Sequence, residues 1–446
     1  MTKDLTNGNP RKLLWQFTLP MFISVIFQQL YSIADSAIAG RFAGEDALAA
    51  VGASYPITMI FMAIAFGCNI GCSVVISQSF GGKRYKEVKT AIFTTLISAT
   101  IISVALTGIG LVATQGLMRL IKTPENIFAN GALYLRIYIL GFLFLFLYNT
   151  ATGIFTSLGD SKTPLYFLIG SSLGNIALDY WFVAKLHLGV AGVAWATFLA
   201  QGIACILALI TLVGRVKKIP TEGKIRIFSW KMLQRIGTIA IPSILQQSFV
   251  SVGNILVQSL INSFGSSVIA GYSAAIKLNT FAITSFATLG NGISNYSAQN
   301  IGAEKIDRVR EGRKIGIQMG LVLALPFLFA YFGFGMTFLG LFMKADSVLA
   351  MKTGQQFLRI VSPFYLAIVI KLVLDGMMRG AGAMKEFMIT TFADLILRVI
   401  LAFFLSGFFQ ELGIWLSWPV GWVVASGLSV YFGQRLLQRL GKGAPE

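Results

Sequence analysis

Two aspartates lie in the middle of apolar segments in the first half of this 446-residue chain. Asp35 lies in the segment 17–39 and Asp179 in the segment 164–183, and neither segment contains a lysine or an arginine. An ionised carboxylate near the centre of a bilayer costs about 2.5–3.5 kcal/mol on insertion scales. Because such a residue normally faces a cavity or a partner, both carboxylates are candidates for binding a cation or a proton.

Polar side chains recur at helical spacing on three segments, so each set lines one face of a helix. The sets are Ser24, Gln28, Tyr31 and Asp35; Ser172, Asn175 and Asp179; and Thr197 and Gln201. Polar faces avoid lipid by pointing into a helix bundle, so the three stripes are expected to converge on one wet cavity. Hydrogen bonds that only hold the helices together are the alternative interpretation.

The predicted cavity offers hard oxygen ligands, namely two carboxylates, a carboxamide and hydroxyls. These ligands suit a proton or Na⁺, and they do not suit zinc or copper. Asp179, Asn175, Thr197 and Asp35 are the candidates for a Na⁺ site, and Tyr31 completes the predicted coupling set. The same oxygens serve both ions, so H⁺ and Na⁺ both remain possible, and no other cofactor is expected.

Four further residues are candidates for the substrate cavity and its gating. Pro20 lies inside the first apolar segment and predicts either a static bend or a hinge. Gln28 and Gln201 belong to the polar stripes. Lys277 has no carboxylate within a helical turn, so it is expected either to line a cavity in the second half or to extend to the membrane interface.

The elements that must position these residues are long apolar helices. Mean hydropathy is +0.74, and 55% of the residues are hydrophobic while 12% are charged, which is too apolar for a soluble protein. Twelve segments can cross a bilayer as helices: 13–39, 47–78, 89–113, 128–157, 163–183, 190–213, 234–262, 268–300, 314–342, 353–378, 387–408 and 413–434. The predicted fold is an all-α polytopic membrane protein.

The net charge of +18 is distributed unevenly between the two sets of connections. One set, together with both termini, holds 25 Lys and Arg residues, whereas the opposite set holds six, namely Arg41, Arg119, Lys122, Lys185, Lys344 and Lys352. This asymmetry follows the positive-inside rule and predicts that both termini are cytoplasmic. The charge is therefore an orientation signal, and a nucleic-acid partner is not expected.

The chain contains an internal repeat. FGGKRYKEV at 80–88 resembles IGAEKIDRV at 301–309 with an offset of 221, and YLRI at 134–137 resembles FLRI at 357–360 with an offset of 223. Two six-helix lobes, 1–213 and 234–446, are therefore expected, joined by the basic cytoplasmic linker 214–233. Parallel repeats of this kind occur in transporters that work by alternating access.

Three charged residues of the second half have nearby partners in the sequence. Asp394 and Arg398 are spaced i, i+4, so a mutual ion pair is expected. Asp375 lies four residues from Lys371 and four from Arg379, which predicts a structural role.

Several segments resemble the MATE (multidrug and toxic compound extrusion) transporters over nearly the whole chain. They are NPRKLLWQFTLPMFISVIFQQLYSIADSAIAGRFAGEDALAAVG, YLRIYILGFLFLFLYNTATGIFTSLGDSKTPL and SLGNIALDYWFV followed by LGVAGVAWATFLAQG. The resemblance implies two six-helix lobes in a bacterial cytoplasmic (inner) membrane. It also implies export of small amphipathic, mostly cationic compounds in exchange for H⁺ or Na⁺. The protein is expected to be a monomer.

The resemblance also assigns roles to residues of the first half. The DinF-like branch of the family uses an N-lobe cation site whose residues match Asp35, Tyr31, Asn175, Asp179 and Thr197, and its kinking proline matches Pro20. The NorM-like branch adds acidic residues in the seventh and tenth helices. The seventh here, ILQQSFVSVGNILVQ, has no carboxylate, so a second site of that kind is not expected.

Two other function classes remain as alternatives. A flippase for lipid-linked saccharide precursors, on a related fold, is expected to place cationic residues in its central cavity, and Lys277 is the residue that fits this alternative. An intramembrane enzyme requires a nucleophile with a base, or a metal pair. The chain contains neither HExxH nor GxSxG, and Gly-Ile-Ser-Asn-Tyr at 292–296 lacks the second glycine. An enzyme is therefore not expected.

Overall fold

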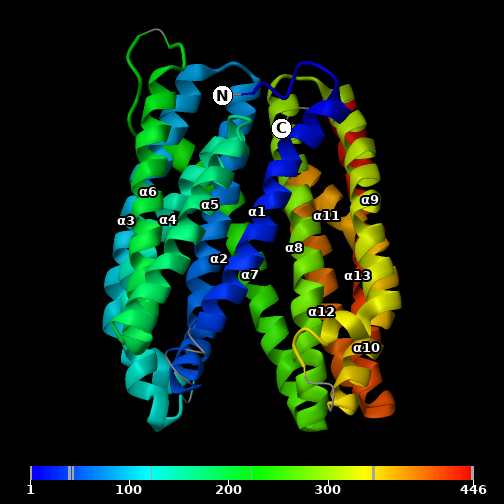
Figure 1. Ribbon diagram of the computed structural model, residues 1–446. Coiled ribbons are helices and arrows are strands. Elements are labelled where there is room, and N and C mark those ends of the chain that lie inside the picture. Colours follow the sequence, from blue (N-terminus) through cyan, green and yellow to red (C-terminus); the bar gives the residue numbers. More distant parts are fainter. Residues whose placement is uncertain are drawn as a thin grey trace. The chain divides into compact units, whose positions relative to one another are not determined.

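The computed structural model describes residues 3–38, 42, 45–121, 123–221, 223–343 and 347–442, and Arg41, Lys122 and Lys344 lie outside this part. The long helices (Figure 1) are α1 (Pro10–Ile38), α2 (Glu45–Gly81), α3 (Tyr85–Leu120), α4 (Glu125–Ser157), α5 (Lys162–Asp179), α6 (Gly189–Lys217), α7 (Trp230–Ile261), α8 (Ser266–Gly302), α9 (Ile306–Leu339), α12 (Met384–Phe409) and α13 (Glu411–Gly441). The tenth segment is divided into α10 (Val348–Val361), the 3-10 turn η4 (Ser362–Phe364) and α11 (Tyr365–Gly380). The twelve predicted helices are confirmed.

Helix α8 differs from the others in composition. Eleven segments of the described chain are long and apolar enough to cross a membrane, and α8 is not among them. It carries Lys277 and many serine, threonine and asparagine side chains, and its second half is almost entirely buried. It packs against α9, α10 and α11. A membrane helix that is covered by protein does not need an apolar surface, which explains the composition of α8.

The backbone repeats at the same offset as the sequence. Lys83 and Glu304, 221 positions apart, both adopt a positive φ, of 55° and 60°. Gly159 and Gly382, 223 positions apart, adopt φ of 77° and 76°. A positive φ is uncommon for a non-glycine residue, so two such residues at equivalent positions show that the α2–α3 and α8–α9 turns have the same conformation.

Close helix packing is also repeated. On α4, a Cβ added at Gly153 would come within 2.9 Å of the Asn69 side chain on α2. On α11, a Cβ added at Gly376 would collide with the backbone carbonyl of Gly290 on α8. These contacts are equivalent under the repeat. Glycine is therefore required where two helix backbones approach closely.

The substitution Gly376→Ala is expected to destabilise the protein because the colliding atom belongs to backbone and cannot move aside cheaply. The melting temperature of detergent-solubilised protein should fall by several degrees, corresponding to about 1–3 kcal/mol. The control is Gly427→Ala on α13, where no atom lies within 4 Å of the added Cβ. Equal melting temperatures for the two variants would contradict this packing.

The described chain forms two compact units. The first contains Met1–Asp4 and Leu19–Leu245, and the second contains Leu5–Thr18 and Gln246–Glu446. The start of α7 thus belongs to the first unit, where Arg235 donates from Nη2 to Gln78 Oε1 at 2.6 Å. The segment that leads into α1 belongs to the second unit, where the Leu5 N–H donates to Gln299 Oε1 at 2.9 Å. Gln78 and Gln299 are equivalent under the repeat. Equivalent glutamines therefore hold the start of α7 in the first unit and the segment before α1 in the second.

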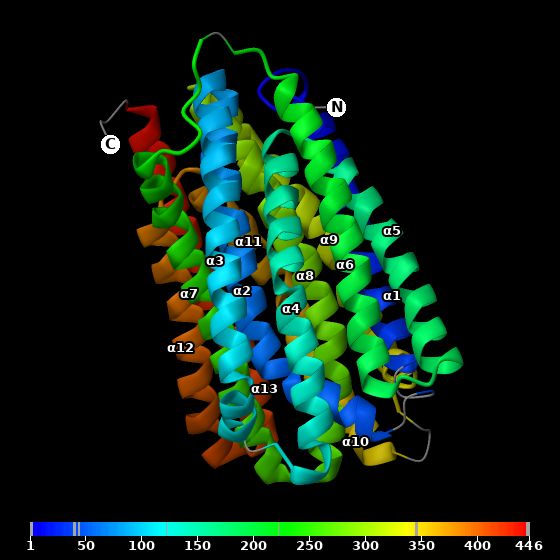
Figure 2. The same ribbon diagram turned by 90° about the vertical axis from the view of Figure 1, so that its left-hand side faces the viewer.

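Each unit is built around one central helix. In the first unit, α4 packs against α2, α3 and α6, while α5 packs against α6 (Figure 2). In the second unit, α11 packs against α8, α9 and α13, while α12 packs against α13. The predicted polar stripes lie in the first unit, on α1, α5 and α6, and α5 and α6 both contact α4.

Candidate functional site: a buried acidic pair

The first unit brings Asp35 of α1 and Asp179 of α5 together. Their carboxyl groups lie within hydrogen-bonding reach of each other. Asp179 is 1% exposed, and the Oδ1 atoms of both residues are buried without a hydrogen-bond partner in the described chain. Two ionised carboxylates present only lone pairs to each other. One shared proton would turn this contact into a hydrogen bond, so the arrangement can accommodate a proton or a cation.

Asn175 connects the acidic pair to α6. It lies one helical turn before Asp179 and is 2% exposed. In the amide orientation that satisfies both ends of the group, its nitrogen donates to Asp179 Oδ2 at 2.7 Å and its oxygen accepts from the Thr197 backbone N–H at 3.1 Å. The opposite orientation donates to Thr197 Oγ1 at 3.3 Å. Either way, Asn175 fixes α5 against α6 beside the carboxylates.

Two tyrosines complete the surroundings of the pair. Tyr31 lies one turn before Asp35 and hydrogen bonds to Thr197, and the charges of both aspartates act on its hydroxyl. The charges of the same two aspartates also act on the hydroxyl of Tyr134 on α4. The sequence pattern indicated Tyr31 but missed Tyr134. Tyr134, Tyr138 and Gly141 are spaced to lie on one face of α4, and this spacing could have indicated Tyr134.

The helix that carries Asp179 changes its winding directly after this residue. It continues as η2, a π-helical turn over Tyr180–Lys185. π-Helical turns are rare, and they occur frequently at functional sites because the extra residue redirects neighbouring side chains. The Tyr180 ring meets Phe42 edge-on, with ring centroids 5.8 Å apart. The sequence pattern did not predict this turn.

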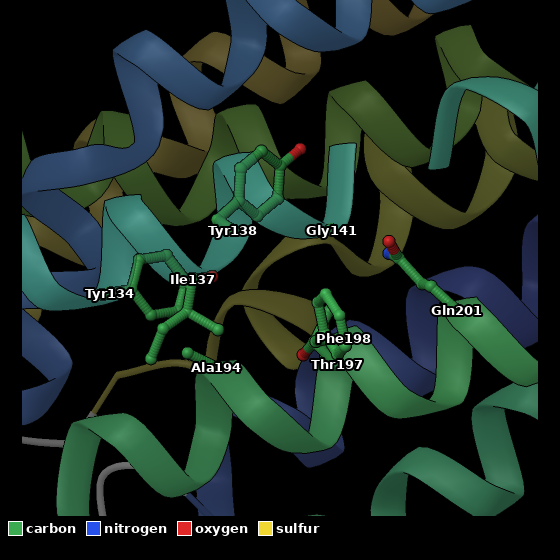
Figure 3. A pocket seen from close by; sticks show the side chains of 8 residues that line it. All are labelled: Tyr134, Ile137, Tyr138, Gly141, Ala194, Thr197, Phe198 and Gln201. Atoms are coloured by element: carbon green, nitrogen blue, oxygen red, sulfur yellow. The ribbon is translucent and has the colours of Figure 1, made fainter. Parts of the chain in front are cut away.

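A cavity of about 10 Å³ lies between α4 and α6 beside the acidic pair. Figure 3 shows Tyr134 and Tyr138 projecting from α4, and Thr197, Phe198 and Gln201 from α6. This volume holds about one water molecule. It is far smaller than the roughly 300–1,000 Å³ of sites for drug-sized ligands. The cavity is therefore a chamber for water or a small ion, and Gln201 lines it.

The other predicted residues, Pro20, Gln28 and Lys277, are not among the groups that act on the acidic pair in the described chain. Helix α1 continues through Pro20, whose carbonyl accepts a hydrogen bond from Ser24 Oγ at 2.9 Å. Gln28 is exposed. In the second unit, Lys277 is exposed, and its Nζ lies 5.8 Å from the centroid of the Phe342 ring.

The buried charges of the second unit centre on Asp375. Its Oδ2 lies 2.7 Å from Lys371 Nζ. Its Oδ1 accepts hydrogen bonds from Thr390 at 3.1 Å and Ser429 at 3.0 Å. Asp375 is thus partnered by side chains of α11, α12 and α13. This arrangement agrees with the structural role predicted for it.

The expected ion pair between Asp394 and Arg398 is not among the ion pairs of the described residues. Asp394 Oδ1 and Arg398 Nε are both buried without a hydrogen-bond partner there. The Arg398 guanidinium lies instead 4.2 Å from the centroid of the Trp418 ring. The prediction was wrong because a planar guanidinium also binds the face of an indole, and residue spacing alone does not show the indole on α13.

Comparison with known proteins agrees with this architecture. The MatE family model matches residues 20–181 and 242–404. The chain is 28% identical to the probable multidrug resistance protein YpnP of Bacillus subtilis (strain 168), covering 95% of this chain and 94% of that protein. It is 23% identical to the multidrug export protein MepA of Staphylococcus haemolyticus (strain JCSC1435), covering 96% and 94%.

A solved structure described as the outward-facing conformation of a multidrug resistance MATE family transporter of the MOP superfamily superimposes with a TM-score of 0.92. It is 22% identical and covers 98% of each chain. The fold is thus that of polytopic MATE transporters. The two matched stretches start 222 residues apart and end 223 apart, as the internal repeat requires. The chain belongs to the MatE family.

Proposed function

We propose that this protein is a multidrug efflux antiporter that exports small amphipathic, mostly cationic compounds in exchange for H⁺ or Na⁺. Family membership and the names of the relatives YpnP and MepA support the transport class. The proposed location is the bacterial cytoplasmic membrane, with both termini cytoplasmic. The proposed active form is a monomer, and assignment to the DinF-like branch remains a prediction.

The contact between Asp35 and Asp179 is the observation that carries the proposal. The groups that act on this pair are the aspartates themselves, with Asn175, Thr197 and Tyr31 beside them. With both carboxylates ionised and no cation bound, the site is anionic and favours a cationic compound. Binding of H⁺ or Na⁺ neutralises the site and weakens that attraction. The two ligands therefore oppose each other, which is the requirement for exchange.

Coupling also requires that the ion bind two conformations with different affinity. A membrane potential supplies about 2.3 kcal/mol per elementary charge for every 100 mV. Ion influx can then drive export of the compound against its gradient. In this scheme the first helix responds to the charge of Asp35, and Pro20 is the proposed point of bending.

Efflux from reconstituted vesicles tests this function directly. The purified protein, in vesicles loaded with a fluorescent lipophilic cation, should accelerate release when an inward H⁺ or an inward Na⁺ gradient is imposed. Each gradient is applied separately, and protein-free vesicles with the same gradients are the control. Release that neither gradient changes would contradict antiport. Transfer of a lipid-linked saccharide in a flipping assay would instead favour the flippase, which the acidic pair disfavours.

A further inference from the structure

The connection between α6 and α7 exposes large apolar side chains next to basic ones. Ile227, Phe228 and Trp230 are 65%, 41% and 65% exposed. Three basic residues close to them in the sequence are also exposed. The six residues, all of which belong to the first unit, are called the linker surface: Lys224, Arg226, Ile227, Phe228, Trp230 and Lys231. None of them belongs to the acidic site.

Ser229 anchors the backbone in the middle of the linker surface. Its N–H donates to Oγ1 of Thr94, a buried residue of α3, at 3.1 Å (Figure 2). Its own Oγ accepts from the Met232 N–H at 3.4 Å, in the first turn of α7. The rings of its two neighbours, Phe228 and Trp230, have centroids 6.5 Å apart. Both rings are therefore exposed on an anchored stretch of backbone.

Helix α3 also holds the preceding part of the linker and adds a positive charge to it. Lys89 Nζ donates to Thr221 Oγ1 at 2.8 Å. The ammonium group of Lys86 lies beside Gly223, where an added Cβ would be 3.4 Å from Nζ. No carboxylate of the described residues forms an ion pair with Lys86 or with the three basic residues of the linker surface. The segment 214–233 contains six Lys or Arg residues and one acid, Glu222, which lies outside the described residues.

The combination of aromatic and basic side chains matches the boundary of a membrane. Trp230 is the first residue of a segment, Trp230–Phe264, that is long and apolar enough to span a bilayer. Tryptophan is enriched at membrane–water interfaces, where its ring lies at the level of the lipid headgroups. Clusters of lysine and arginine next to a membrane helix attract anionic lipids. A layer of anionic lipid covers the exposed rings and neutralises the basic groups at the same time.

We propose that the linker surface binds anionic phospholipid. Ile227, Phe228 and Trp230 enter the boundary between headgroups and acyl chains, while the basic residues, with Lys86, contact the headgroups. A headgroup with a net negative charge is preferred over a zwitterionic one, because only the former neutralises the surface. Since Ser229 joins this surface to α3 and to α7, the bound lipid holds the connection between α6 and α7. The proposal requires a membrane protein and does not depend on antiport.

Brominated lipids test this surface in the full-length protein, because bromine quenches the fluorescence of a tryptophan that it contacts. The protein is reconstituted in phosphatidylcholine vesicles that contain the same small fraction of brominated phosphatidylglycerol or of brominated phosphatidylcholine. The signal of Trp230 is the difference between the wild type and Trp230→Phe. Quenching by phosphatidylglycerol should exceed quenching by phosphatidylcholine about fivefold, the factor that one basic residue near an anionic surface contributes. The excess should fall as salt is added, and it should disappear in the neutral linker variant Lys224→Gln/Arg226→Gln/Lys231→Gln.

The matched control is Lys314→Gln/Lys352→Gln/Lys442→Gln, which removes three exposed lysines of the second unit. This variant loses the same net charge and should keep the excess quenching by phosphatidylglycerol. Equal quenching by the two lipids in the wild type would overturn the proposal, and so would an excess that survives in the neutral linker variant. If neither lipid quenches Trp230, the surface faces water, and the lipid is refuted in favour of an acidic protein partner. These outcomes are independent of transport, so failure of the lipid proposal leaves antiport intact.

Discussion

Asp35→Asn and Asp179→Asn are each expected to abolish ion-driven efflux while leaving folded protein in the membrane. Asparagine has nearly the same shape as aspartate and can still donate a hydrogen bond across the pair, so the contact between the two side chains should survive. It cannot bind a proton or carry the negative charge that attracts a cation. The exchange cycle then loses its ion-binding step. Cells of a drug-sensitive host that produce either variant should be as sensitive as cells without the transporter.

The measurements for these variants are drug susceptibility, vesicle efflux under an imposed gradient, and the amount and melting temperature of the membrane protein. The control is Asp307→Asn, which removes a carboxylate with a 94% exposed side chain at the start of α9. This control should retain wild-type resistance. Normal resistance in Asp35→Asn would refute the role of the carboxylate. If Asp35→Asn loses folded protein, Asp35→Glu becomes the test, since it keeps the charge and should restore measurable efflux.

Lys371→Met should be strongly destabilising. The ammonium group pairs with Asp375 at 2.7 Å, and the two side chains are 4% and 3% exposed. Removal of one partner leaves an uncompensated buried charge, which costs about 3–5 kcal/mol. Lys371→Met combined with Asp375→Asn should recover most of the loss, because the neutral amide oxygen still accepts from Thr390 and Ser429. Thermal melting in detergent checks both variants.

Arg310→Met provides the comparison for this pair. It removes an ion pair with Asp307 whose side chains are 46% and 94% exposed, so it should cost less than about 1 kcal/mol. A melting temperature of Lys371→Met close to that of Arg310→Met would show that the buried pair does not stabilise the second unit. Absence of any recovery in the double variant would show that Lys371 stabilises the unit by packing and not by charge.

The helices were predictable because their signal is local. A bilayer-spanning stretch is apolar along its length, and even α8, which is largely covered by protein, was among the twelve predicted segments. The repeat was equally visible, since Lys83 and Glu304 occupy matching places in both the sequence and the backbone. The stripes on α1, α5 and α6 were also readable, because the spacing of three and four residues fixes a helix face.

What the sequence did not show depends on which helices face each other. Tyr134 lines the same cavity as Thr197 because α4 packs on α6, and spacing within α4 does not contain that information. Arg398 has a carboxylate one turn away and an indole from another helix, and the choice between them is made by packing. The π-helical turn after Asp179 contains one additional residue per turn. The composition of Tyr180–Lys185 does not predict it.

The start of α1 belongs to the second unit and the start of α7 belongs to the first, which affects how the chain is assembled. Residues 5–18 precede residue 246 by more than half of the chain, yet their unit is otherwise made of residues 246 and beyond. More than half of the polypeptide must be synthesised after them before the other residues of their unit are present. The first unit, conversely, is incomplete until residue 245 has been translated. Neither half of the sequence contains all the residues of one unit, so completion of each unit requires segments from both halves.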